Sequence, residues 1–276
     1  MDMGIKSAIL ATQPTSYWPL DDAVGSTSCH DEMGLHATSA PPPGVNLAVI
    51  PFGEILAPYF DGALGSALAI DSDPKYSQPY ANALSVAAWI CPLALDNTQT
   101  VGKKDQYVYF LEKAVASSTD VEWAMRFYNK TNPTRHSRLS FYTFNLGADP
   151  GEGNGSYMEY GVSANDETPI EVGKWVFLVG EAEPYISPGD LTTGCIVWKQ
   201  NVEATRVLED KYGRYGVQPQ AGSGAITIGG TQETAFKGSI AHVAIWNRLL
   251  SAPEIASIWA EGQTELLNTP MYHSYT

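Results

Sequence analysis

The fold is decided by residues 236–262, which read FKGSIAHVAIWNRLLSAPEIASIWAEG. The first half of this stretch, SIAHVAIW at 239–246, is apolar at most positions and predicts a β-strand, in which alternate residues share a face. In this alternation His242 lies between Ile240 and Ala244. We expect it to be an outward strand residue rather than a general base.

A helix is predicted directly after this strand. Ser251 and Glu254 have the spacing of a capping box, in which each side chain satisfies a free N–H group of the first helical turn. Three apolar side chains then form one stripe at helical spacing: Ile255, Ile258 and Trp259. Gly262 follows as a typical C-terminal stop. We therefore predict one short C-terminal helix over 251–262, lying against the β-structure and covering one of its edges.

Strand patterns recur along the rest of the chain, separated by Gly, Pro, Asn and Asp residues. The predicted strands are 16–20, 58–62, 67–71, 84–90, 106–111, 122–128, 138–144, 156–162, 174–183, 193–200, 225–229 and 239–246. Several of them, such as 174–183, are partly apolar on both faces, which is typical of strands in packed sheets. The pattern predicts an all-β fold, a sandwich of two antiparallel sheets.

One domain is predicted over residues 1–262, followed by a tail over 263–276 that lacks periodicity. A chain of 276 residues can form one large sandwich with a well-buried core. Three long loops interrupt the strand pattern, at 41–57, 145–155 and 184–192. Long loops on an all-β scaffold are where binding usually takes place.

The charge balance excludes some classes of partner. There are 30 acidic and 16 basic residues, which gives a formal net charge of −14. Nucleic acid and anionic membranes attract positive proteins, so neither is an expected partner. No apolar window approaches the roughly 18 residues of a membrane-spanning helix, and the run AILA near the N-terminus is too short for the core of a signal peptide.

The three cysteines, Cys29, Cys91 and Cys195, are widely spaced and odd in number. Neither a disulfide framework nor a metal-ligand spacing is therefore expected. Cys91 and Cys195 lie inside apolar strand patterns and are predicted to be small core residues.

Three stretches together resemble the laminin-G-like, concanavalin A-like lectin and glucanase superfamily. They are SYWPLDDAVGSTSCHDEMG at 16–34, FDG at 60–62 followed by LSVAAWI at 84–90, and the closing strand and helix at 228–262. The resemblance implies a two-sheet antiparallel jelly roll. The chain departs from the family at Ala241-His242, where many relatives carry an acidic pair. This departure weakens the case for a calcium site of the family type.

Catalytic motifs of such folds are not found in the sequence. The string Glu-x-Asp-x-x-Glu of sandwich glycosidases, which places two carboxylates beside the scissile bond, does not occur. The stretch DKYGRYGVQ at 210–218 echoes the lyase motif of related folds, with Lys211, Tyr212 and Tyr215 as candidate acid and base groups. Its partner strands are missing, so we expect a non-enzymatic protein.

A metal site is the second candidate. Asp21, Asp22, Asp31 and Asp61 lie on segments that the resembling family brings together at one end of the sandwich, where oxygen ligands would suit Ca²⁺. The alternative is that Asp31 and Asp61 stabilise turns before glycines. No cofactor is required, and the candidate calcium ligands are Asp22, Asp31 and Asp61. The histidines in HDEMGLH at 30–36 match no zinc spacing.

A binding face is the third candidate. If Trp123, Met125 and Phe127 point inward, strand alternation places their neighbours on the opposite face. The side chains predicted on that face are Tyr107, Tyr109, Arg126, Tyr128, Tyr142, Tyr157 and Glu159. Tyrosine rings with charged groups at the rim suit a sugar site, because the rings stack on sugars and the rim forms hydrogen bonds. Ordinary cross-strand aromatic packing would give the same pattern.

The sequence therefore predicts a binding or structural module on the outside of an assembly. A phage virion protein, such as a head decoration or tail-associated protein, is the expected setting, with the virion surface as its location. Its partners would be a surface glycan or another virion or cell-surface protein, and the chain would be a homo-oligomer or an assembly subunit. The alternatives are a carbohydrate-active lyase or hydrolase, and an extracellular lectin of the same fold.

Overall fold

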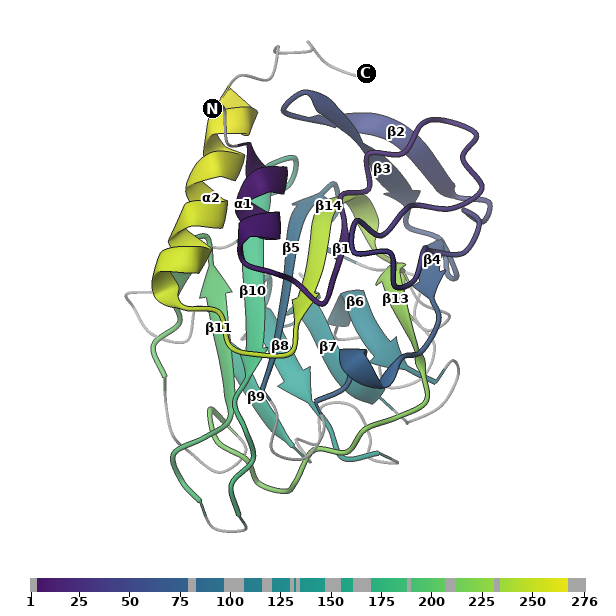
Figure 1. Ribbon diagram of the computed structural model, residues 1–276. Coiled ribbons are helices and arrows are strands. Elements are labelled where there is room, and N and C mark those ends of the chain that lie inside the picture. Colours follow the sequence, from purple (N-terminus) through teal and green to yellow (C-terminus); the bar gives the residue numbers. More distant parts are fainter. Residues whose placement is uncertain are drawn as a thin grey trace.

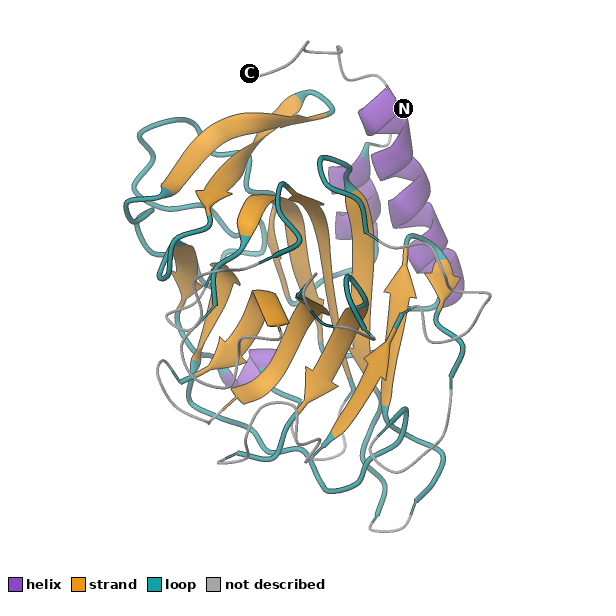
Figure 2. Ribbon diagram, turned by 180° about the vertical axis from the view of Figure 1, so that it is seen from behind, coloured by secondary structure: helices purple, strands orange, loops and turns teal. Residues whose placement is uncertain are grey.

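The computed structural model describes residues 4–78, 83–96, 107–115, 121–129, 132, 135–146, 155–160, 170–187, 190–206, 212–230 and 234–267. These residues form two antiparallel sheets packed face to face, with two helices on the outer face of one sheet (Figures 1 and 2). The predicted two-sheet β-sandwich is confirmed, and each predicted strand range overlaps a strand of the structure.

The larger sheet has eight strands. Its order is β12 (Val202–Glu203), β11 (Cys195–Lys199), β10 (Val176–Ala182), β5 (Leu84–Pro92), β14 (Lys237–Trp246), β3 (Ile55–Asp61) and β2 (Val45–Phe52), and β1 (Ser16–Trp18) also pairs with β14. All nine residues of the central strand β5 are buried. This agrees with its sequence LSVAAWICP, which is apolar or small on both faces.

The smaller sheet has six strands. Its order is β4 (Ala67–Ile70), β13 (Ala225–Gly229), β6 (Tyr107–Ala114), β7 (Val121–Tyr128), β8 (Leu139–Thr143) and β9 (Ser156–Glu159). A 3₁₀ turn, η1 (Pro74–Tyr76), follows β4. The main core lies between the two sheets and includes Trp18, Phe60, Ile90 and Phe141.

The segment 41–57, predicted to be a loop, instead contains β2 and the start of β3, which pair as a hairpin. Two features of β2 explain why the sequence pattern did not predict this strand. Its burial pattern does not alternate, and its register shifts between Asn46 and Ile50. β2 also contains Pro51, which is tolerated because β2 lies at the edge of the sheet and needs no ladder hydrogen bond on its outer side.

The predicted C-terminal helix is present, and a second helix that the sequence did not predict, α1 (Ile5–Ala11), precedes the first strand. It is only seven residues long, and its N-cap Gly4 makes no side-chain cap hydrogen bond. A helix this short is unstable alone. Here it packs beside α2 (Ala252–Leu267), whose Glu265 Oε1 accepts a hydrogen bond from the Ile5 N–H at 2.7 Å (Figure 1). Sequence patterns do not reveal a cap supplied by another helix.

One half of the predicted capping box of α2 is confirmed, because the Ser251 N–H donates to Glu254 Oε2 at 2.8 Å. The Ser251 hydroxyl donates to the same carboxylate oxygen at 2.8 Å instead of accepting a backbone N–H. The predicted end at Gly262 is wrong: the helix continues to Leu267, so residues 263–267 are not a tail. Residues 268–276 lie outside the described residues. Gly262 serves packing instead, since a Cβ atom there would lie 2.2 Å from Cζ2 of Trp89.

The helices cover the outer face of the eight-stranded sheet, whereas the sequence predicted that one helix would cover an edge (Figure 1). A second apolar cluster fills this layer and includes Ile9, Trp89, Phe177, Trp246 and Ile258. Cys29, Cys91 and Cys195 are buried and unpaired, as small core residues are. No helix in the described ranges is both long and apolar enough to cross a membrane.

Substitution of Gly262 by Ala should destabilise the protein, although the same change in an ordinary helix interior stabilises it by about 1 kcal/mol. The added methyl group collides with Trp89, and overpacking of this kind costs about 1–3 kcal/mol. Urea unfolding measures the free energy. Ser257→Ala on the exposed face of α2 is the matched control and should change stability little. A Gly262→Ala variant as stable as the parent would contradict the packing role of this glycine.

The Glu254 carboxylate should stabilise the folded protein by an amount that depends on pH. Hydrogen bonds from the Arg248 guanidinium, at 2.7 and 3.0 Å, lower the pKa of Glu254 from 4.5 to about 2. Because the folded-state pKa is the lower one, the contribution is fully present above pH 4.5 and is lost as the pH falls towards 2. Glu254→Gln should cost about 1 kcal/mol at neutral pH, and the difference from the parent should shrink on acidification. An unfolding difference that is constant between neutral pH and pH 2 would refute this.

Candidate functional site

The outer face of the six-stranded sheet carries the side chains that the sequence predicted there. Trp123, Met125 and Phe127 of β7 belong to the core between the sheets, so Arg126 points to the opposite side. A separate cluster on that opposite side contains Tyr109, Val121, Ala124, Tyr142 and Phe144, with Tyr107 and Tyr157 packed against it. The predicted division of residues between the two faces is thus confirmed.

Arg126 occupies the centre of this face, between aromatic rings. Its guanidinium carbon lies 3.7 Å from the ring centroid of Tyr107 and 3.7 Å from that of Tyr142. The Tyr142 ring stacks in turn on Tyr157, with centroids 4.9 Å apart and an interplanar angle of 6°. The four side chains form one ladder from β6 through β7 and β8 to β9. A desolvated cation between two rings gains about 2 kcal/mol or more from such contacts.

The Arg126 side chain is fully buried and has no anionic partner among the described residues. Its Nη1 donates to the Tyr109 hydroxyl. Within the described part of the chain, Nε and Nη2 have no hydrogen-bond acceptor. Burial raises the pKa of the Tyr109 and Tyr142 phenols, so these neighbours stay neutral. A buried charge without a counterion costs several kcal/mol, so Arg126 is a charge that an incoming anion would stabilise.

A second polar group adjoins the ladder. The Tyr128 hydroxyl donates to Glu159 Oε1 at 2.6 Å and accepts from Arg135 Nη1 at 2.9 Å. Glu159 is buried and also lies 3.2 Å from Arg135 and 3.6 Å from Arg138. Its carboxylate is therefore neutralised by two arginines, and burial raises the pKa of Tyr128. This arrangement holds the carboxylate in place.

Three residues of this face were not predicted to lie on it: Arg135, Arg138 and Tyr212. The two arginines lie in the turn between β7 and β8. The only signal for them in the sequence is their position just before a predicted strand. Tyr212 packs edge-on against Tyr157 with centroids 5.0 Å apart.

The predicted open binding surface needs one correction. Tyr109, Arg126, Tyr128, Tyr142 and Glu159 are all buried, and only Tyr107 and Tyr157 are partly exposed. Alternation identifies the face on which a side chain lies, but it does not reveal whether that face is covered. In this structure the accessible part of the site is therefore its tyrosine rim, and a ligand has to displace part of this rim to reach Arg126.

The predicted calcium ligands do not meet in the described residues. Both carboxylate oxygens of Asp31 accept backbone N–H groups, from Tyr17, Met33, Leu35 and His36. Asp61 accepts from the Ala63 N–H and the Ser66 hydroxyl at 2.8 Å each. These contacts stabilise turns, which is the alternative that the sequence left open.

Within the described ranges, one group of side chains lies close enough together to hold a metal ion: Asp21, Asp22 and His30. In it His30 Nδ1 lies 2.8 Å from Asp22. His36 lies elsewhere, paired with Asp73 at 3.2 Å, so the HDEMGLH histidines do not form one site.

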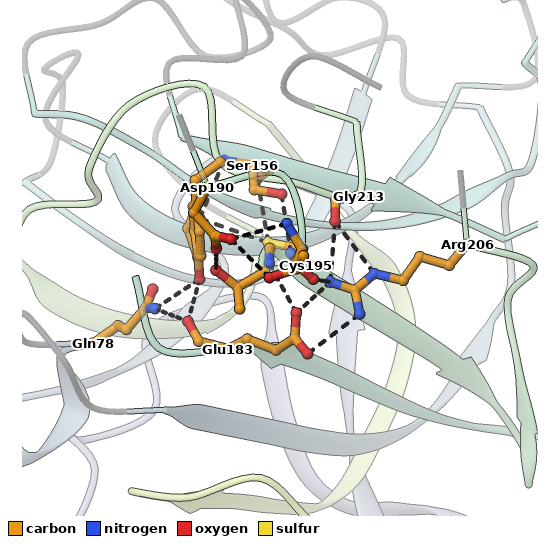
Figure 3. A network of polar contacts seen from close by, with 12 residues as sticks. Gln78, Ser156, Glu183, Asp190, Cys195, Arg206 and Gly213 are labelled. Carbon is orange, nitrogen blue, oxygen red and sulfur yellow. Dashed lines mark hydrogen bonds and ion pairs between the residues drawn. The ribbon is translucent and has the colours of Figure 1, made fainter. Parts of the chain in front are cut away.

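Of the lyase-like candidates, Tyr212 packs against Tyr157 of the ladder, whereas Tyr215 belongs to a polar network around Glu183 and Arg206 (Figure 3). The Glu183 carboxylate is paired with Arg206 and accepts the Gly194 N–H at 2.9 Å, and the Glu183 carbonyl accepts the Tyr215 hydroxyl at 2.5 Å. These contacts fix both ends of the segment 184–192, which the sequence predicted to be a long loop. Lys211 lies outside the described residues.

His242, predicted to face outward, is buried. The register of β14 shifts between Ala241 and Ala244, and His242 has a positive φ of 51°. A bulge of this kind turns a side chain away from the direction that simple alternation gives.

Comparisons with known proteins show the fold and nothing finer. No family model matches the sequence, and no curated protein sequence matches it. Trypanosoma rangeli sialidase in complex with 2,3-difluorosialic acid superimposes with a TM-score of 0.58 at 11% identity, covering 92% of this chain and 34% of that one.

A second similar structure is the ligand binding domain of botulinum neurotoxin serotype D in complex with N-acetylneuraminic acid. It gives a TM-score of 0.58 at 12% identity, covering 92% of this chain and 52% of that one. The serotype D binding domain on its own gives 0.56 at 15% identity, covering 93% and 53%. This chain thus spans between a third and about half of the structures that it resembles. At these identities the likeness establishes a shared all-β fold.

Proposed function

We propose that this chain is a non-catalytic binding module whose tyrosine and arginine face on β6–β9 binds a glycan through a carboxylate of the sugar. The observation that carries the proposal is Arg126, a fully buried guanidinium with two unpaired donors in the described part of the chain. Nε and Nη2 form one edge of the guanidinium, and this edge matches the two oxygens of a carboxylate.

The local charge supports an acidic ligand. The chain as a whole is acidic, with a net charge of −14. Around the ladder, however, three arginines lie close together: Arg126 between the tyrosine rings, and Arg135 and Arg138 beside the carboxylate of Glu159. Because Glu159 is already paired with Arg135 and Arg138, the charge of Arg126 is the one left for a ligand.

The half-exposed tyrosines supply the flat aromatic surface that a sugar site also needs. Tyr107 and Tyr157 lie at either end of the ladder and are its partly exposed rings. Flat aromatic faces stack on the apolar side of a sugar ring. Two of the similar folds are described in complexes with sialic acid derivatives, sugars that carry a carboxylate, which is consistent with the proposal.

The finer expectations from the sequence stay predictions. They are the laminin-G-like family, the phage virion and its surface as the setting, homo-oligomeric assembly, and calcium binding. The absence of enzymatic activity and the alternative of a carbohydrate-active enzyme stay predictions as well.

Substitution of Arg126 should separate binding from stability. An array of acidic and neutral glycans identifies ligands, and titration with N-acetylneuraminic acid then measures affinity. Arg126→Met should weaken binding of acidic glycans by about 10- to 100-fold, the value of a charged hydrogen bond or pair. The same variant should be as stable as the parent or more stable, because it removes an unpaired buried charge.

Arg248→Met is the matched control, since it removes an arginine whose partner Glu254 is on the helix side of the molecule. It should lower stability and leave glycan binding unchanged. The proposal is wrong if the parent binds no acidic glycan, or if Arg126→Met lowers stability while binding is retained.

A further inference from the structure

A second site lies on the other side of the eight-stranded sheet, away from the Arg126 ladder. It is a cavity of about 270 Å³ between α1, α2 and the turn that joins β2 to β3. Figure 1 shows the two helices side by side, with the tip of this hairpin near their upper ends. The side chains used below all line this cavity: Lys6, Asp21, Glu54, His242, Glu261 and Glu265.

The cavity is strongly acidic. Four carboxylates line it, against the single amine of Lys6. That amine is paired with Glu32, which does not line the cavity. One carboxylate, Glu265, has a structural task because it accepts the Ile5 N–H. Asp21 also lies 3.9 Å from Nε2 of His30. Its negative charge and those of Glu54 and Glu261 remain to attract a cation.

His242 forms the buried end of the cavity. It is 2% exposed, whereas the carboxylates around it are partly or fully exposed. Its Nδ1 lies 2.7 Å from the Tyr17 hydroxyl, and its Nε2 is buried without a partner among the described residues. Burial, and to a smaller extent Lys6, lowers the pKa of His242 to about 3, so the imidazole is neutral at physiological pH.

The backbone at His242 indicates that this orientation is imposed. The residue has a φ of 51° inside a strand, a conformation that non-glycine residues rarely adopt. Strained positions of this kind concentrate at ligand sites. The positive φ belongs to the bulge of β14. The buried, unpaired Nε2 is the observation that is independent of the acidic lining.

A metal ion does not fit the arrangement as it stands. First-row metals bind nitrogen and oxygen ligands at about 2.0–2.2 Å, so ligand atoms must lie close together. In the described ranges, the one group of three possible ligands within 4.8 Å is Asp21, Asp22 and His30, which excludes His242. A cavity of 270 Å³ is also far larger than an ion and approaches the size of small-molecule sites.

We propose that this cavity binds a primary ammonium group carried by a small organic ligand or side chain. Asp21, Glu54 and Glu261 supply the opposite charge, and His242 Nε2 accepts one N–H of the ammonium. The Nδ1–H then donates to the Tyr17 oxygen, which fixes the tautomer. This inference goes beyond glycan binding at the Arg126 ladder and does not depend on it.

Two probes carry the same ammonium from different sources: glucosamine represents an amino sugar, and Nα-acetyl-lysine methylamide represents a lysine of a protein partner. N-acetylglucosamine is the uncharged control ligand. Isothermal titration calorimetry measures affinity, and long-range ¹H–¹⁵N NMR spectra of the histidine side chains report directly on His242 Nε2. We expect at least one amine to bind and to shift the Nε2 resonance, while N-acetylglucosamine does neither.

The variants Glu54→Gln and Glu261→Gln each remove one negative charge from the cavity and so test its contribution to amine binding. Both positions are partly or fully exposed, so the substitutions should not impair folding. Each should weaken amine binding by about tenfold, the effect of one charged pair of roughly 1.4 kcal/mol. Glu171→Gln changes the same charge at an exposed position outside the cavity and should leave binding unchanged.

Binding of glucosamine alone would assign the site to an amino sugar, and binding of the lysine derivative alone would assign it to a protein partner. The proposal is overturned if neither amine binds at millimolar concentration, or if Glu54→Gln and Glu261→Gln bind as the parent does.

Discussion

The structure depends on burying both faces of the central strand β5. Leu84–Pro92 has no exposed residue, and its neighbours β10 and β14 are almost as apolar. A sheet with two apolar faces needs a layer on each side. The six-stranded sheet covers one face, and α1 with α2 covers the other, where Trp89 packs directly on Gly262. This constraint explains why a short, poorly capped segment such as Ile5–Ala11 is helical.

The same layering determines where function can lie. With both faces of the eight-stranded sheet used for packing, the outer face of the six-stranded sheet is left to carry polar and aromatic side chains. There Arg126 is held between Tyr107 and Tyr142 without an acidic partner in the described residues. A buried unpaired charge opposes folding, and a well-packed apolar residue would be more stable. Its presence is better explained by a ligand than by the fold.

The two candidate sites have opposite charge and lie on opposite sides of the sandwich. The Arg126 ladder offers a cation in an aromatic setting, and the His242 cavity offers carboxylates around a neutral imidazole. In a chain of net charge −14, an acidic cavity is unremarkable by itself. What sets this cavity apart is His242 at its buried end, whose Nε2 has no partner among the described residues. By contrast, the acidic residues Asp31 and Asp61 are fully engaged in turns.

The sequence by itself determined the strands, the capping contact between Ser251 and Glu254 and the division of β6–β9 residues between two faces, because alternation and capping are local patterns. Tertiary structure alone decided four further features: the helix at α1, the continuation of α2 past Gly262, the burial of the Arg126 ladder, and the inward turn of His242. Each of these depends on contacts between residues far apart in the chain. Local periodicity shows the direction in which a side chain points, but what meets it there depends on how the layers pack.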